Sequence, residues 1–356
     1  VYLQHQIQQI PGLDGRHARI YTTPVSSESL GPPVSWFNPT QVPIEIVTTL
    51  MLNGKTRSSI RFVGVEGSSW GQWSGVNGFF DTAPNGRVHF SIHSPLFMLS
   101  DEDRRLEAHS IRLTGELGDP SEAGYIVGDM VFEIGRLQID EAGSPLAVFD
   151  GLRFASSSHR DAEMIGGTFD FGFDELAIDG ESYRDGRLSL AFERFDAAAL
   201  ALMLKLAWAD ELGGLALFTN TLALIRHSPA LSLEQIQLTS SAGRFEGRAK
   251  VALDFTTQAG QALDLSVLQV DGYLASSLAL LESLLVRGLR VQLARDGLVE
   301  GVDYQDKQLH ELAREQIAGA INMGWLKEQG DTVLIDFELI GGQLRVNGMP
   351  LSLIQR

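Results

Sequence analysis

The chain has 356 residues, of which 44% are hydrophobic and 21% charged, so its composition is that of a folded globular protein and not of a disordered chain. Its 28 basic and 45 acidic residues give a formal net charge of −17, which repels phosphate backbones and argues against nucleic acid as a partner. The absence of cysteine excludes disulfides, thiolate catalysis and cysteine-ligated zinc, and it is compatible with an oxidising compartment.

The N-terminal part of the chain is predicted to be a succession of β-strands and turns. Apolar residues recur at every second position from about residue 19 to residue 117, the spacing that sends alternate side chains to opposite faces of a strand. Asn53-Gly54 lies between two such runs, and this dipeptide indicates a β-hairpin because both residues tolerate a positive φ. We therefore expect antiparallel strands joined by hairpins.

A stripe of three phenylalanines indicates an apolar face further along the chain. Phe169, Phe171 and Phe173 alternate with small or acidic residues, so their three rings are expected on one side of a strand. Asp170 and Asp174 fall on the other side, which in a half-buried antiparallel sheet faces solvent. That position argues against reading these two carboxylates as a glycosidase pair.

After residue 195 the apolar period changes from two to three or four, which predicts helices at residues 197–208 and 215–226. Asp196 is placed to cap the first helix, Gly213-Gly214 separates the two, and Pro229 ends the second. Further helices are expected at residues 276–293 and 306–323. Because helices precede a strand pair twice, at residues 196–255 and 276–346, an internal duplication is one interpretation.

These elements together predict an α+β fold. We expect a long, curved, mainly antiparallel β-sheet, either a half-barrel or an extended meander, with amphipathic helices packed on one apolar face. Residues 1–195 are expected to form an N-terminal β-meander region. Residues 196–356 are expected to form a helix-plus-sheet region that is continuous with the first.

The sequence contains no recognisable catalytic or metal-binding motif. The histidines lack metal-ligating spacings such as HExxH, and His89 and His93 would lie about 13 Å apart along one face of a strand. The polar segment at residues 156–161 is interpreted as a loop between two strands and not as part of a Ser-His-Asp triad. We therefore predict no catalytic residue, no metal and no cofactor.

Three segments carry a resemblance to a known family. They are His227-Ser228-Pro229 after an apolar helix, the strand Ser241-Ala242-Gly243-Arg244-Phe245-Glu246-Gly247, and the C-terminal run from Gly341 to Gly348. From about residue 124 onward the chain resembles the YdgA-like family of Gram-negative bacterial envelope proteins, whose biochemical activity is unassigned. The resemblance implies a periplasmic protein, anchored in the inner membrane through an N-terminal segment that is absent from this sequence.

Three functional hypotheses follow, of which a carboxylate-dependent hydrolase ranks last because no catalytic constellation supports it. The first is a non-enzymatic protein that binds a lipid or another hydrophobic ligand in a groove between sheet and helices. The alternative is a structural or protein-interaction module of the cell envelope, with a homodimer as one form. The candidate groove residues are Phe169, Phe171, Phe173, Trp70, Trp73 and Trp208.

Overall fold

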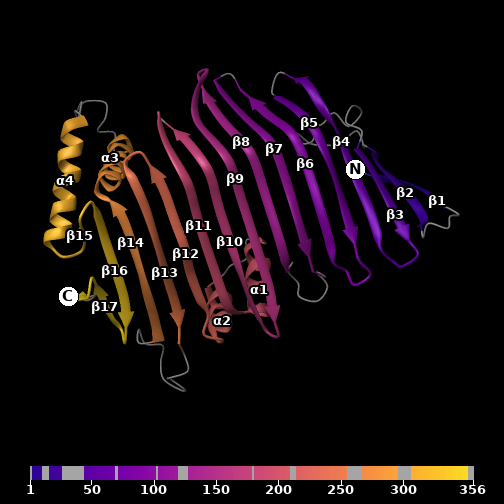
Figure 1. Cartoon of the computed structure of the whole chain (residues 1–356). Coiled ribbons are helices and arrows are strands. Elements are labelled where there is room, and N and C mark those ends of the chain that lie inside the picture. The colour runs from indigo at the N-terminus through magenta and orange to yellow at the C-terminus, as the bar shows by residue number, and fades with distance from the viewer. Residues whose placement is uncertain are drawn as a thin grey trace. The chain divides into compact units, whose positions relative to one another are not determined.

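The computed structural model describes most of the chain, in ten segments. These are residues 2–9, 16–25, 44–68, 71–101, 103–118, 127–178, 180–208, 214–254, 267–295 and 306–351. Within them the chain forms 18 strands and four helices, and the strands are those of an antiparallel sheet, as the α+β class predicts (Figure 1). The chain divides into two compact units: Val1–Arg160 with Phe169–Gly180, and Asp161–Thr168 with Glu181–Arg356.

Unit 1 is built from strands that pair antiparallel in chain order, which is the connectivity of a meander. Its strands are β1 (Tyr2–Gln9), β2 (Arg16–Val25), β3 (Ile44–Met51), β4 (Thr56–Ser68), β5 (Gly71–Thr82), β6 (Val88–Ser100), β7 (Arg104–Leu117), β8 (Gly128–Glu141), β9 (Ser144–Asp161) and the part of β10 (Met164–Ile178) from Phe169 onward. The predicted Asn53-Gly54 hairpin is confirmed: it joins β3 to β4, with Gly54 at a φ of 78°.

One local expectation in unit 1 is wrong. Residues 156–161, interpreted from the sequence as a polar loop, are the end of β9, where Ser156 and Ser158 lie opposite Met130 and Gly128 of β8. The Ser158 hydroxyl accepts a hydrogen bond of 3.2 Å from the Gly128 N–H. Short hydroxyl side chains are polar enough to signal a loop, but they also fit a solvated strand.

The core of unit 1 lies where the ladders of β7, β8 and β9 are interrupted at the same level. Ser110, Gly135 and Gly151 lack a partner in these ladders, and Ser110 and Gly151 have positive φ angles of 54° and 66°, while the register is the same on both sides of the interruption. The alternation of side chains changes at this level, because Ile134 and Leu137 are three residues apart and yet pack in the same core cluster.

Unit 2 combines a second set of antiparallel strands with all four described helices. Its elements are β11 (Glu181–Asp196), α1 (Ala197–Trp208), α2 (Gly214–Ile225), β12 (Ala230–Ser240), β13 (Gly243–Leu253), β14 (Leu268–Ser277), α3 (Leu278–Arg295), α4 (Asp306–Asn322), β15 (Lys327–Gln329), β16 (Thr332–Ile340), β17 (Gln343–Val346) and β18 (Met349–Leu351). The strands pair consecutively from β11 to β14, then β14 pairs with β16. The four predicted helices are thus confirmed within two residues of their predicted bounds.

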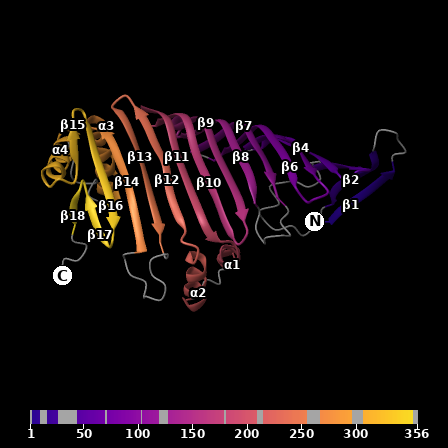
Figure 2. The same cartoon turned by 60° about the horizontal axis from the view of Figure 1, so that its bottom comes forward.

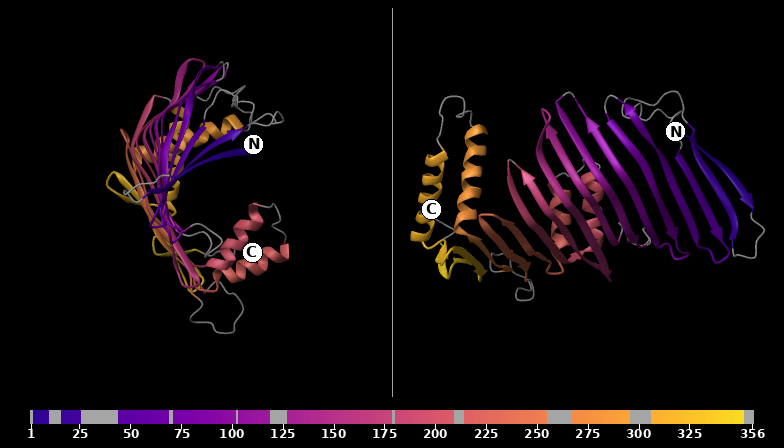
Figure 3. Two further views of the ribbon diagram at one scale, coloured as in Figure 1. Left: turned by 90° about the vertical axis from the view of Figure 1, so that its right-hand side faces the viewer. Right: turned by 45° about the horizontal axis from the view of Figure 1, so that its top comes forward.

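The helices form two hairpins. α1 and α2 lie side by side beyond the end of β11 (Figure 2), and α3 and α4 lie side by side with α3 against β13 and β14 (Figure 3). A core of Val286, Leu309 and Ala313 joins α3 to α4. Among the described helices, none has the length and apolarity that crossing a membrane requires.

Candidate functional site

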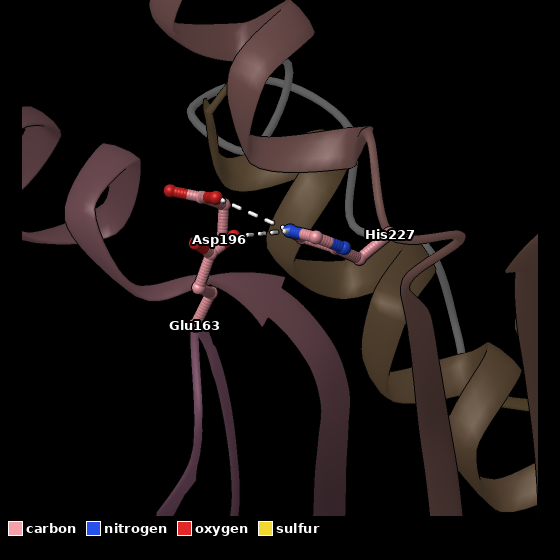
Figure 4. Close-up of side chains that lie close together, drawn as sticks. All are labelled: Glu163, Asp196 and His227. Atoms are coloured by element: carbon pink, nitrogen blue, oxygen red, sulfur yellow. Dashed lines mark ion pairs between the residues drawn. The ribbon is translucent and has the colours of Figure 1, made fainter.

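Four charged or titratable side chains of unit 2 converge where the first helical hairpin joins the strands. Glu163 lies in the turn before β10, Asp196 is the last residue of β11, and Arg226 and His227 follow α2. Figure 4 shows the Glu163, Asp196 and His227 side chains pointing toward one another from these three places. The fold thus brings together residues that lie far apart in the sequence. We call these four residues the Glu163 cluster.

Asp196 positions the start of α1, as the sequence predicts. Its Oδ1 accepts a 2.8 Å hydrogen bond from the Ala199 N–H, which is the geometry of a helix N-cap. The backbone N–H of Ala197 donates to the Glu163 carbonyl at 2.9 Å, so the turn that carries Glu163 is attached to the same helix end. Asp196 is only 3% exposed.

The Arg226 guanidinium is the cation of the cluster. Its Nη2 forms ion pairs with Asp196 Oδ2 and, at 3.2 Å, with Glu163 Oε2. Its Nε donates a 3.0 Å hydrogen bond to His227 Nε2. The same ring nitrogen lies 3.4 Å from Asp196 Oδ2, so Arg226 and His227 both contact the Asp196 carboxylate.

The cluster holds the Asp196 carboxyl ionised. Burial by itself raises the pKa of Asp196, but the hydrogen bond from the Ala199 N–H and the nearby charge of Arg226 outweigh burial and lower the pKa below its ordinary value. A carboxylate with a lowered pKa suits ion pairing or metal ligation and does not suit a general acid. The sequence predicts that Asp196 is a cap, but it does not reveal the partners Glu163, Arg226 and His227.

A second carboxylate–histidine–arginine group joins α3 to α4. Glu282 on α3 accepts from His310 Nδ1 at 2.7 Å and from Arg314 Nε at 3.0 Å, both on α4. The hydrogen bond from Arg314 lowers the pKa of Glu282. With one carboxylate and one imidazole, this group offers fewer metal ligands than the Glu163 cluster, and it serves below as a matched control.

The predicted groove residues fall into three groups. Phe171 and Phe173 pack against the buried core of unit 1, and their ring centroids lie 6.2 Å apart, whereas Phe169 is 54% exposed. Trp73 is partly buried and donates from Nε1 to Ser94 Oγ at 3.0 Å. Trp70, and the side chain of Trp208 at the end of α1, lie outside the described residues.

The structure adds aromatic residues to the Phe171–Phe173 pair that sequence alternation did not identify. The Phe154 ring lies 4.8 Å from that of Phe171, and the Phe149 ring lies 6.0 Å from that of Phe173. Phe149 and Phe154 are five residues apart, so strict alternation places them on opposite faces. The ring contacts show that the alternation changes between them, where Gly151 has a positive φ and no partner in the β8–β9 ladder.

Comparison with known proteins gives a family but no activity. Protein YdgA of Escherichia coli (strain K12) is 22% identical over 261 residues, which are 65% of this chain and 50% of that protein, so the chain spans about half the length of this curated relative. No solved structure matches the chain. A family model described as "Bacterial protein of unknown function (DUF945)" matches residues 1–353. The predicted YdgA-like resemblance is therefore confirmed, and the chain belongs to the DUF945 family of bacterial proteins of unknown function.

Proposed function

We propose that the protein is a non-enzymatic binder of a lipid acyl chain, or of a similarly elongated apolar ligand, on one face of the unit 1 sheet. We further propose that it acts at the periplasmic side of the cell envelope, as the family resemblance implies. The observation that carries the proposal is the segregation of apolar and charged residues into rows that cross the strands of unit 1.

The apolar rows follow from the strand register. Residues directly opposite one another in antiparallel neighbours project to the same face. One row crosses five strands, and a second row crosses four. The members are Trp73, Phe97, Ala108, Leu137 and Phe149 in the first row and Ile92, Leu113, Phe132 and Phe154 in the second. We call the side to which these rows project the apolar face.

The opposite face of the same strands is charged. One row there consists of His93, Arg112, Glu133 and Arg153, in neighbouring strands from β6 to β9. Arg153 Nη1 lies 3.4 Å from Glu133 Oε1 across the β8–β9 ladder. The two faces therefore offer different chemistry, and only the apolar face suits a hydrocarbon ligand.

Part of the apolar face is open. Phe154 is 44% exposed and Phe169 54%, and the described residues of unit 1 are strands and turns, so no helix of that unit covers these rings. Neighbouring strands lie about 4.8 Å apart, so a row across five strands extends about 19 Å. That length matches an extended fatty acyl chain and exceeds a compact metabolite.

The electrostatics of the described carboxylates support a non-enzymatic function. Asp81, Asp196 and Glu282 have pKa values shifted from the ordinary range, and all three are lowered. A hydrolase that uses two carboxyl groups needs one whose pKa is raised, so that it can donate a proton near neutral pH. In each case an arginine is among the groups that lower the pKa, which is typical of a structural ion pair.

The test is a titration with a fluorescent long-chain fatty acid, together with native mass spectrometry of the purified chain for bound lipid. Replacing Phe154 by Gln places an amide among the apolar rings, and we expect affinity to fall by about tenfold, the effect of roughly 1.4 kcal/mol. The matched control is Phe79→Gln, because Phe79 lies in a row with Ser91 and Thr114 on the charged face.

Saturable binding that Phe154→Gln weakens and Phe79→Gln leaves unchanged supports the proposal. Equal weakening in both variants would assign the binding to some other surface. If the parent chain neither carries lipid nor binds the fatty acid, the proposed ligand class is wrong.

A further inference from the structure

We propose that Glu163, Asp196 and His227 form a binding site for a divalent transition-metal ion such as Zn²⁺, which exchanges with the Arg226 guanidinium. The three side chains offer two carboxylates and one imidazole nitrogen, a donor set that such ions accept. The site is independent of the apolar face and of its proposed ligand.

The separations between ligand atoms suit one ion. Each of the three residues offers an atom within 4.8 Å of the atoms offered by the other two. His227 Nε2 lies 3.4 Å from Asp196 Oδ2 and 4.0 Å from Glu163 Oε2. Ligands at 2.0–2.2 Å from a tetrahedral ion are about 3.4 Å apart, so the Asp196–His227 pair already has this spacing and Glu163 needs a small rotation.

A buried oxygen faces this site and contacts the guanidinium that the ion would replace. Asp196 Oδ2 is buried, and Arg226 Nη2 lies against it as an ion pair. Buried carboxylate oxygens normally accept hydrogen bonds or ligate a metal. His227 Nε2 accepts from Arg226 Nε, so when Arg226 leaves, the lone pair of this nitrogen becomes available to an ion.

Charge favours the exchange. The two carboxylates carry a charge of −2, which one guanidinium neutralises only by half and one divalent ion neutralises fully. The Arg226 side chain is 53% exposed, so it can rotate into solvent when an ion binds, whereas the Asp196 side chain is fixed by its role as the α1 cap. The ligands come from the turn before β10, from β11 and from the end of α2, so the ion would fasten the base of the first helical hairpin.

The experiment titrates Zn²⁺ into the untagged, chelator-treated full chain in competition with a chromophoric chelator, and it records visible spectra with Co²⁺. We expect one ion per chain and the visible absorption of cobalt bound by nitrogen and oxygen. His227→Gln should weaken binding at least about tenfold, and so should Asp196→Asn, which keeps a residue able to cap α1. Arg226→Ala should strengthen binding, because it removes the competing cation.

The matched control is His310→Gln, which alters the second carboxylate–histidine–arginine group and should leave the affinity unchanged. Circular dichroism of each variant establishes that it is folded before its titration is interpreted. Binding that survives both His227→Gln and Asp196→Asn, or a parent chain that takes up no ion, overturns the proposal. An Arg226→Ala variant that binds Zn²⁺ no more tightly than the parent overturns the proposed exchange between the ion and the guanidinium.

Discussion

Asp196 Oδ1 accepts the backbone N–H of Ala199 at 2.8 Å, so the last residue of β11 is also the cap of α1. The same carboxylate is paired with Arg226 beyond the end of α2, which makes it the point where both ends of the first helical hairpin meet the strands. The stability of this junction therefore depends strongly on one buried side chain.

Asp196→Ala is expected to destabilise unit 2 by about 1–2 kcal/mol, because it removes a helix cap and leaves Arg226 without its buried partner. The measurement is urea denaturation followed at the helical circular dichroism band, since the described helices all lie in unit 2. Asp196→Asn is the control: it preserves the cap and should lose less. Equal losses in the two variants would show that the ion pair and not the cap carries the effect.

The lowered pKa of Asp196 makes the same junction sensitive to acid. A carboxyl whose pKa is lower in the folded than in the unfolded chain contributes stability above the unfolded pKa, about 3.9, and this contribution is lost as pH falls through the folded value. The difference in urea midpoint between the parent and Asp196→Asn should thus be constant from pH 7 to pH 5 and shrink below about pH 4. A difference that grows on acidification would contradict the assignment.

The core of unit 1 gives a third test. Ile134 is buried in the core cluster and lies opposite Ile111 and Leu152, so Ile134→Ala should cost about 2–4 kcal/mol. Val131 occupies the other face of the same strand, where it is partly buried, and Val131→Ala should cost less than about 1.5 kcal/mol. Hydrogen exchange of peptides from β8 and β9 measures the loss of stability in each of the two variants. Similar protection in the two variants would mean that the faces are wrongly assigned.

Local patterns in the sequence were sufficient to predict the hairpin at Asn53-Gly54 and the helices at residues 197–208 and 215–226, because turn residues, caps and apolar period act over a few neighbouring positions. They were not sufficient for the faces of β8 and β9. The alternation changes at Gly151, which has a positive φ, and a glycine within a strand does not by itself reveal that its φ is positive.

The Glu163 cluster could not be predicted from the sequence for a different reason. Its members lie on three segments that are neighbours in space because β11 pairs with β12 and α2 lies beside α1. Short spacings such as HExxH reveal metal ligands that are neighbours in the sequence, whereas this arrangement depends on topology. The one local signal was Asp196 before an apolar helix, and it predicted the cap and not the ion pairs.

The left-handed backbone of Gly151, next to the buried Leu152, gives the last test. Gly151 has a φ of 66°, and a Cβ at this position would lie 2.1 Å from Asp174 Oδ2. Gly151→Ala should therefore cost about 1 kcal/mol for the left-handed backbone and a further amount for moving the Asp174 side chain. Urea denaturation with hydrogen exchange at β9 provides the measurement.

Gly143 provides the matched control, since it has a φ of 79° and a Cβ added there would meet nothing within 4 Å, so Gly143→Ala should show only the backbone cost. Adding Asp174→Ala to Gly151→Ala should reduce the loss to the level of Gly143→Ala, because the crowded carboxylate is gone. If the double variant is no more stable than Gly151→Ala alone, crowding by Asp174 is not the cause, and the excess cost lies in the strand register itself.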